Sequence, residues 1–214
     1  MICLRQRGIA GDPGAVVTEI TLDHQFLMSS RNTASERALA RLALEMHAGS
    51  GLQALVGGLG LGYTAREALA SERVARVEVV ELLEPVICWL ELGLVPLAGE
   101  LRADPRFAVA KGDVYRRLAG PPERLFDLIL VDVDHSPDEP LGAASAAFYR
   151  EPGLALARRH LAPDGVLGVW SYAPSPRFET ALRRVFREVR TAPLRFENPV
   201  VDATETNWLF FARG

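Results

Sequence analysis

Three acidic side chains stand where predicted strands end in this chain of 214 residues. Glu81, Asp113 and Asp132 each follow a short, mainly apolar segment. In an open parallel sheet, the carboxyl ends of the strands form the edge at which ligands bind. A single acid at such a position is more often the N-cap of the next helix, since Asp is preferred there. Three acids beside one glycine-rich turn favour a binding site instead.

The glycine-rich turn precedes the first of these acids, in the segment Leu55-Val56-Gly57-Gly58-Leu59-Gly60-Leu61-Gly62. The apolar run before it is too short for a helix, and the glycines disfavour one. A helix can begin just beyond, at Tyr63. Backbone without side chains lets a ligand approach, and the start of a helix offers free N–H groups. We therefore predict that this turn holds a nucleotide-like cofactor, although glycine turns also serve plain packing.

The position of Glu81 narrows the choice of cofactor. It lies 19 residues after Gly62, near the roughly 20-residue offset at which an acid binds ribose hydroxyls. This spacing suits both NAD and S-adenosylmethionine. The only lysine, Lys111, has Phe107 four residues before it, so the Tyr-x-x-x-Lys pair of short-chain dehydrogenases is absent. No Gly-Lys-[Ser/Thr] sequence for ATP exists either, and S-adenosylmethionine is favoured.

The elements that must position these residues alternate between strand and helix. Strands are expected near 54–56 and at 74–81, 107–110, 125–133, 166–171, 191–196 and 207–212, with helices at 85–92, 143–160 (interrupted at Pro152-Gly153) and 177–189. Such alternation predicts helices on both faces of a parallel sheet. The final helix and two strands are typical of methyltransferase sheets. We expect a Rossmann-like, doubly wound, mostly parallel seven-stranded α/β sheet of the class I methyltransferase type.

The first part of the chain predicts a separate structure. Partial period-2 alternation over 16–29, with a turn at Asp23-His24, indicates a β-hairpin, and a helix follows the capping residues 30–32. We expect residues 1–48 to form a hairpin and helix on the substrate side. Residues 49–214 would form the cofactor-binding domain.

Composition limits the remaining classes. The apolar content of 49% suits one full core, and the net charge of −3 argues against a general nucleic-acid partner. No run of 18 apolar residues and no signal-peptide core occurs, so we expect a soluble, cytoplasmic protein without a membrane partner. Cys3 and Cys88 lack metal-ligand spacing, and no metal site is expected. The partner would be a small-molecule acceptor. The sequence is also compatible with a homodimer.

Several segments together resemble the spermidine synthase-like branch of class I S-adenosylmethionine-dependent methyltransferases. They are 56–62, 80–87, 112–114, 126–132, 148–149 and 161–167, so the likeness covers roughly 16–190. The resemblance implies that Gly57, Gly58, Gly60 and Gly62 contact the methionine and ribose part. It implies that Glu81 and the adjacent Leu82 hold the ribose side, and that Asp113 and the adjacent Val114 hold the adenine side. Asp132 matches the acid that orients or deprotonates the attacking amine, and it also borders the cofactor.

The chain departs from polyamine synthases on the substrate side. They carry a second acid three residues after the first, where this chain has His135, and an aspartate in the glycine turn, where this chain has only Gly and Leu. Their N-terminal diamine cluster is also missing. Methyl and aminopropyl transfer are both in-line attacks on a carbon next to a sulfonium, so the protein must position a nucleophile and accept its proton. Asp132, Asp134 and His135 are the candidates for that role.

These departures decide the expected function. We predict methyl transfer from S-adenosylmethionine to a small acceptor. The alternative is aminopropyl or related alkyl transfer to an amine, with decarboxylated S-adenosylmethionine as donor. A cofactor-binding protein without catalysis is the second alternative.

Overall fold

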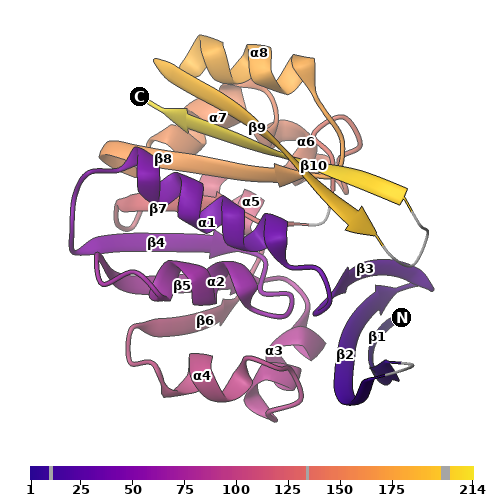
Figure 1. The fold of residues 1–214 in the computed structure, drawn as a ribbon. Coiled ribbons are helices and arrows are strands. Elements are labelled where there is room, and N and C mark those ends of the chain that lie inside the picture. Colours follow the sequence, from indigo (N-terminus) through magenta and orange to yellow (C-terminus); the bar gives the residue numbers. More distant parts are fainter. Residues whose placement is uncertain (10–11, 134, 199–202) are drawn as a thin grey trace.

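A seven-stranded sheet forms the centre of the computed structural model, which describes residues 1–9, 12–133, 135–198 and 203–214 (Figure 1). Its strand order is β6-β5-β4-β7-β8-β10-β9. The strands are β4 (Leu52–Gly57), β5 (Val74–Glu81), β6 (Phe107–Lys111), β7 (Phe126–Val131), β8 (Leu161–Ser171), β9 (Glu188–Asn198) and β10 (Ala203–Arg213). The first five are parallel, and β10 runs antiparallel to both β8 and β9. The predicted fold class is confirmed.

Helices cover both faces of this sheet. They are α1 (Ala34–Met46), α2 (Tyr63–Leu69), α3 (Glu84–Glu91), α4 (Ala98–Ala103), α5 (Val114–Ala119), α6 (Ala143–Phe148), α7 (Glu151–Arg158) and α8 (Pro176–Val185). Side chains of α1 to α4 share one hydrophobic cluster and those of α5 to α8 another. Successive residues of β7 alternate between the clusters, with Leu128 and Leu130 in the first and Ile129 and Val131 in the second. This alternation follows from the period of 2 in a strand, and burial on both faces explains the unbroken apolar run.

Two predicted helices have different bounds in the structure. The helical segment 143–160 is divided at residues 149–150, before Pro152-Gly153, and Pro152 lies in the first turn of α7. Proline is tolerated there because the first turn has no intrahelical partner for its N–H. The helix predicted over 177–189 ends at Val185, and Glu188 already begins β9.

A second, antiparallel sheet precedes α1. It consists of β1 (Ile2–Ile9), β2 (Asp12–Leu22) and β3 (Gln25–Ser29) in that order. The predicted hairpin is β2-β3, and Asp23 and His24 form its turn with φ of 48° and 67°, as a two-residue hairpin turn requires. β1 was not expected. Figure 1 shows this N-terminal sheet beside the carboxyl ends of the central strands.

In the described part of the chain, no helix is long and apolar enough to cross a membrane. The longest helix, α1, has 13 residues. It packs against α2 and β8 and contributes buried side chains to the core.

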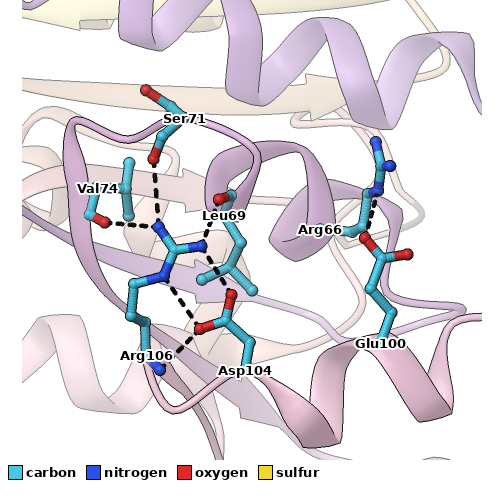
Figure 2. A network of polar contacts seen from close by, with 7 residues as sticks. All are labelled: Arg66, Leu69, Ser71, Val74, Glu100, Asp104 and Arg106. Carbon is cyan, nitrogen blue, oxygen red and sulfur yellow. Dashed lines mark hydrogen bonds and ion pairs between the residues drawn. The ribbon is translucent and has the colours of Figure 1, made fainter.

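One arginine joins three elements at the amino edge of the central sheet (Figure 2). Arg106, just before β6, donates to the carbonyl oxygens of Leu69 at 2.6 Å and Val74 at 3.0 Å. These carbonyls belong to the end of α2 and the start of β5. Its guanidinium also binds the Asp104 carboxylate at 2.7 Å, and this hydrogen bond lowers the pKa of Asp104. Arg106 therefore satisfies the Leu69 carbonyl, which α2 leaves without an intrahelical partner, and connects it to the start of β5.

We predict that Arg106→Ala lowers the free energy of unfolding by about 2 kcal/mol, because charged hydrogen bonds to backbone carbonyls are lost. Arg66→Ala is the matched control, since Arg66 forms a more exposed ion pair with Glu100 at 3.0 Å (Figure 2). Its loss should cost less than about 1 kcal/mol. Urea unfolding measures both. Equal stability of the two variants would contradict the bridging role of Arg106.

Candidate functional site

A cavity of about 500 Å³ lies at the carboxyl edge of the central sheet. Its wall contains seven of the residues predicted from sequence: Gly58, Gly60, Glu81, Leu82, Asp113, Val114 and Asp132. They come from the ends of β4, β5, β6 and β7 and the residues just after them. The other two predicted glycines face protein atoms, because a side chain on Gly57 would meet Val114 and one on Gly62 would meet Leu101.

The glycine turn is pressed against the start of the loop after β7. The backbone N–H of Asp132 donates to the Gly57 carbonyl at 2.8 Å, and Gly58 N–H donates to Val80 at 2.9 Å. Gly58 has φ of 96°, and a Cβ atom there would overlap the carbonyl oxygen of Asp132. This is the point where the strand order reverses between β4 and β7, which is where open α/β sheets bind ligands.

Glu81 connects the end of β5 to the glycine turn. Its carboxylate accepts hydrogen bonds from the backbone N–H of Leu59 at 2.7 Å and of Leu83 at 2.7 Å. The side chain lines the cavity and is 6% exposed. An ionised carboxylate has about four acceptor sites, so two remain for the hydroxyl groups of a ribose. Glu81 thus holds the glycine turn in place, and its carboxylate oxygens still have lone pairs that can accept hydrogen bonds in the cavity.

Asp113 is the N-cap of α5. One carboxylate oxygen accepts from the N–H groups of Tyr115 at 2.9 Å and Arg116 at 3.2 Å. The other lies 3.5 Å from the exposed Arg116 guanidinium. The capping interpretation holds for this acid, yet the residue also lines the cavity, and its second oxygen can still accept from an adenine amino group.

Tyr115 lies in the same wall but offers no proton transfer at neutral pH. Its hydroxyl is 2.8 Å from that of Tyr149. Burial, with Tyr149 adding to it, raises the pKa of Tyr115 far above its ordinary value, and burial also raises the pKa of Tyr149 to about 12. Both phenols therefore stay protonated and serve as packing groups.

Asp132 is held by a residue that sequence reasoning did not select. The Thr64 hydroxyl donates to the Asp132 carboxylate, and it also lies 3.3 Å from the Glu36 carbonyl oxygen. Thr64 is buried in the first turn of α2, directly after the glycine turn. A hydroxyl side chain at a helix start beside a candidate ligand loop was the available signal.

His135, a second candidate proton acceptor, is placed differently from Asp132. His135 packs edge-on against Tyr172, with ring centroids 6.3 Å apart, and the Tyr172 hydroxyl donates to Glu139. His135 is not among the residues that line the cavity in the described structure. Asp134 lies outside the described residues. Of the two candidates that the structure describes, Asp132 is the one found in the cavity wall.

Two further segments contribute to the wall, the N-terminal sheet expected on the substrate side and a segment around the start of α6 that the sequence did not indicate. The N-terminal sheet contributes Ile2, Ile20, Leu22, Leu27 and Met28, and the start of α6 contributes residues 141–145. The Met28 sulfur lies over the glycine turn, 2.5 Å from where a Cβ atom on Gly60 would be. The N-terminal sheet thus closes the cavity opposite the strand ends.

Two curated proteins that this chain resembles in sequence carry the name polyamine aminopropyltransferase. The chain is 32% identical over 165 residues to polyamine aminopropyltransferase 2 of Streptomyces coelicolor, which covers 75% of this chain and 28% of that protein. It is 28% identical over 120 residues to a polyamine aminopropyltransferase of Prochlorococcus marinus, covering 56% of this chain and 40% of that one. The chain spans less than half the length of these relatives. No family model matches it.

Solved structures show the same architecture. A spermidine synthase in complex with the transition state analogue AdoDATO superposes with a TM-score of 0.74 and 20% identity, over 92% of this chain and 66% of that one. The chain has the spermidine synthase-like fold. The spermidine synthase of Thermotoga maritima gives 0.72 and 20%, over 92% and 65% of the two chains. Human methyltransferase-like protein 13 in complex with SAH gives 0.55 and 22%, over 83% and 78%. The predicted resemblance to the spermidine synthase-like branch of the class I fold is confirmed.

In this spermidine synthase-like chain, we predict that Gly58→Ala is strongly destabilising. Its left-handed backbone and the overlap with the Asp132 carbonyl should together cost more than about 2 kcal/mol. Gly99→Ala is the control, because a Cβ atom there meets open space. Thermal and urea unfolding compare the two. A Gly58→Ala variant as stable as Gly99→Ala would show that the turn does not need the close approach.

Proposed function

We propose that this chain binds S-adenosylmethionine or its decarboxylated form and transfers an alkyl group from it to a small acceptor. The observation that carries the proposal is the single cavity at the switch point, in which seven predicted residues meet. Gly58 and Gly60 would lie along the methionine and ribose part, and Glu81 would accept from the ribose hydroxyls. Asp113 would accept from the adenine amino group between the apolar side chains of Leu82 and Val114.

The chain's own residues supply positioning and proton transfer. When bound, the cofactor supplies a carbon activated by the adjacent sulfonium. Asp132 would accept the proton of the attacking nitrogen, and the Thr64 hydroxyl would fix the orientation of its carboxylate. Held at contact distance, the nucleophile gains the rate advantage of an intramolecular reaction.

The relatives favour aminopropyl transfer to an amine. Both curated relatives described above carry the name polyamine aminopropyltransferase, so the expected preference for methyl transfer gains no support from them. An amine nucleophile also fits Asp132, because a carboxylate both attracts an ammonium and takes its proton. We therefore place aminopropyl or related alkyl transfer first.

Methyl transfer is the second candidate, and it rests on the glycine turn. Leu59 and Leu61 occupy the positions between its glycines and are buried, with 6% and 0% exposed. The turn thus presents no carboxylate to the amino-acid end of the cofactor. A carboxylated cofactor would meet no repulsion there.

We also propose that two parts of the chain have different roles. Residues 1–48 would form the substrate side of the cavity, through the N-terminal sheet. Residues 49–214 would bind the cofactor.

Product analysis tests the proposed function. The protein is incubated with each cofactor form and a panel of amines, and the thioether released is identified by mass spectrometry. Methylthioadenosine formed from the decarboxylated cofactor is the expected result, whereas S-adenosylhomocysteine from the intact cofactor would select methyl transfer. Cofactor binding without either product would select the non-catalytic alternative. Absence of binding to either form would contradict the proposal.

Glu81→Gln should lower the affinity for the cofactor at least about tenfold, because charge-assisted hydrogen bonds to the ribose become neutral ones. Gln keeps one oxygen that can accept from one of the two N–H groups, of Leu59 or Leu83, whereas Ala would accept from neither. Glu84→Gln is the matched control, since Glu84 is exposed at the same edge and pairs with Lys111. Titration calorimetry with S-adenosylhomocysteine and methylthioadenosine measures both variants. Unchanged affinity in a folded Glu81→Gln variant would mean that Glu81 holds the glycine turn and does not bind the ribose.

A further inference from the structure

The wall that the N-terminal sheet contributes to the cavity is apolar throughout. Ile2, Ile20, Leu22, Leu27 and Met28 are all of its lining residues among those that the structure describes. Ile20 is 2% exposed and belongs to the core cluster, and the other four are partly buried. A substrate group that faces this wall meets hydrocarbon on every side chain.

Two acids of the first 23 residues, Glu19 and Asp23, point away from the cavity. Glu19 lies between two inward-facing positions of β2 and pairs with Arg7 at 2.7 Å. Asp23, in the exposed turn, pairs with the N-terminal amine. Neither lines the cavity. The alternation along β2 places Ile20 and Leu22 inward and Glu19 outward, as the period of a strand dictates.

Carboxylates on the facing elements are engaged in other ways. Glu81 and Asp113 bind backbone N–H groups, as described above, and Arg116 adds a positive charge at the Asp113 end of the cavity. Glu36, near Thr64 on α1, is not a lining residue, and burial raises the pKa of its carboxyl group. Glu139 is bound by Tyr172. Within the described residues, Asp132 is the acid at the junction between the cofactor side and the apolar wall.

We propose that the acceptor is an amine whose single charged group is the attacking nitrogen at Asp132, and whose remainder is an apolar chain seated on Ile20, Leu22, Leu27 and Met28. The inference rests on the proposed alkyl transfer to an amine. A diamine would place its second ammonium against this wall, and an uncompensated buried charge is strongly unfavourable. An alkyl chain gains free energy from the same burial.

The transfer step balances for such an acceptor. The ammonium gives one proton to Asp132, and the nitrogen lone pair then attacks the carbon next to the sulfonium. The carbon–sulfur bond breaks with both electrons going to sulfur, which becomes a neutral thioether. The positive charge ends on the alkylated nitrogen.

The test compares pentylamine with 1,4-diaminobutane, in which a second amino group replaces the terminal methyl group. With the cofactor form that the protein uses, we expect kcat/KM for pentylamine to be at least about tenfold higher. Propylamine, butylamine and pentylamine should improve by about fourfold per methylene. Calorimetric binding of the same amines to the protein saturated with the product thioether should follow the same order without turnover.

A matched pair of variants examines the wall itself. Leu27→Glu introduces a carboxylate into it and should shift the preference toward 1,4-diaminobutane by at least about tenfold. Phe26→Glu is the control, because the neighbouring Phe26 is 61% exposed and does not line the cavity. It should leave the preference unchanged. If Leu27→Glu does not fold, the wild-type comparison decides alone.

The outcomes separate the two proposals. Efficient alkyl transfer with 1,4-diaminobutane equal to or better than pentylamine overturns the apolar acceptor and leaves the proposed function standing. Cofactor binding with no transfer to any amine overturns the apolar amine acceptor together with the function placed first, aminopropyl or related alkyl transfer to an amine.

Discussion

The join between β4 and β7 is the constraint on which the rest of the site depends. Asp132 donates its backbone N–H to Gly57, and the next residue of the turn, Gly58, has no side chain, so the Asp132 carbonyl can lie against it. The sheet order reverses at this join, with β5 and β6 on one side and β7 onward on the other. Helices leaving the two sides diverge, and the space between them is the cavity. Any side chain at Gly58 would separate the strands at this point.

Glu81 converts that gap into a defined site. The same carboxylate that is proposed to meet the ribose already holds Leu59 and Leu83 through their backbone N–H groups. Its position is therefore set before a ligand arrives, which reduces the ordering cost of binding. Asp113 repeats the arrangement at the next strand by capping α5. Structural capping and ligand binding are compatible because a carboxylate has more acceptor sites than its backbone partners use.

The N-terminal sheet adds an apolar wall to the cavity at the edge of the common fold. The central sheet agrees with the spermidine synthase-like fold. The five side chains that face them from β1, β2 and β3 carry no charge. The edge of the central sheet and the apolar wall come from different parts of the chain. Substitutions in one of them can therefore leave the geometry of the other unchanged. Our proposals for the acceptor depend on this separation.

Local patterns were sufficient to predict most of the elements and the grouping of three acids at one edge of the sheet. The run Leu128-Ile129-Leu130, buried on both sides, and the glycine turn identify strands from their immediate neighbours in sequence. Acids at the ends of parallel strands must then share one edge, so Glu81, Asp113 and Asp132 could be grouped correctly. The helix break was misplaced because Pro152 is equally acceptable within the first turn of α7. β1 was missed because most of its side chains are exposed and leave no clear period.

By itself, the sequence determined the sheet type, the switch point and the acids placed there, because these follow from periodicity and from residues that are close in the chain. Only the tertiary structure showed that Thr64 holds Asp132 from 68 residues away, that His135 packs on Tyr172, and that Ile20 and Met28 line the cavity. Each of these contacts joins segments distant in sequence. Their geometry is set by how the N-terminal sheet, α2 and the loop after β7 meet in space, and no local pattern encodes that meeting.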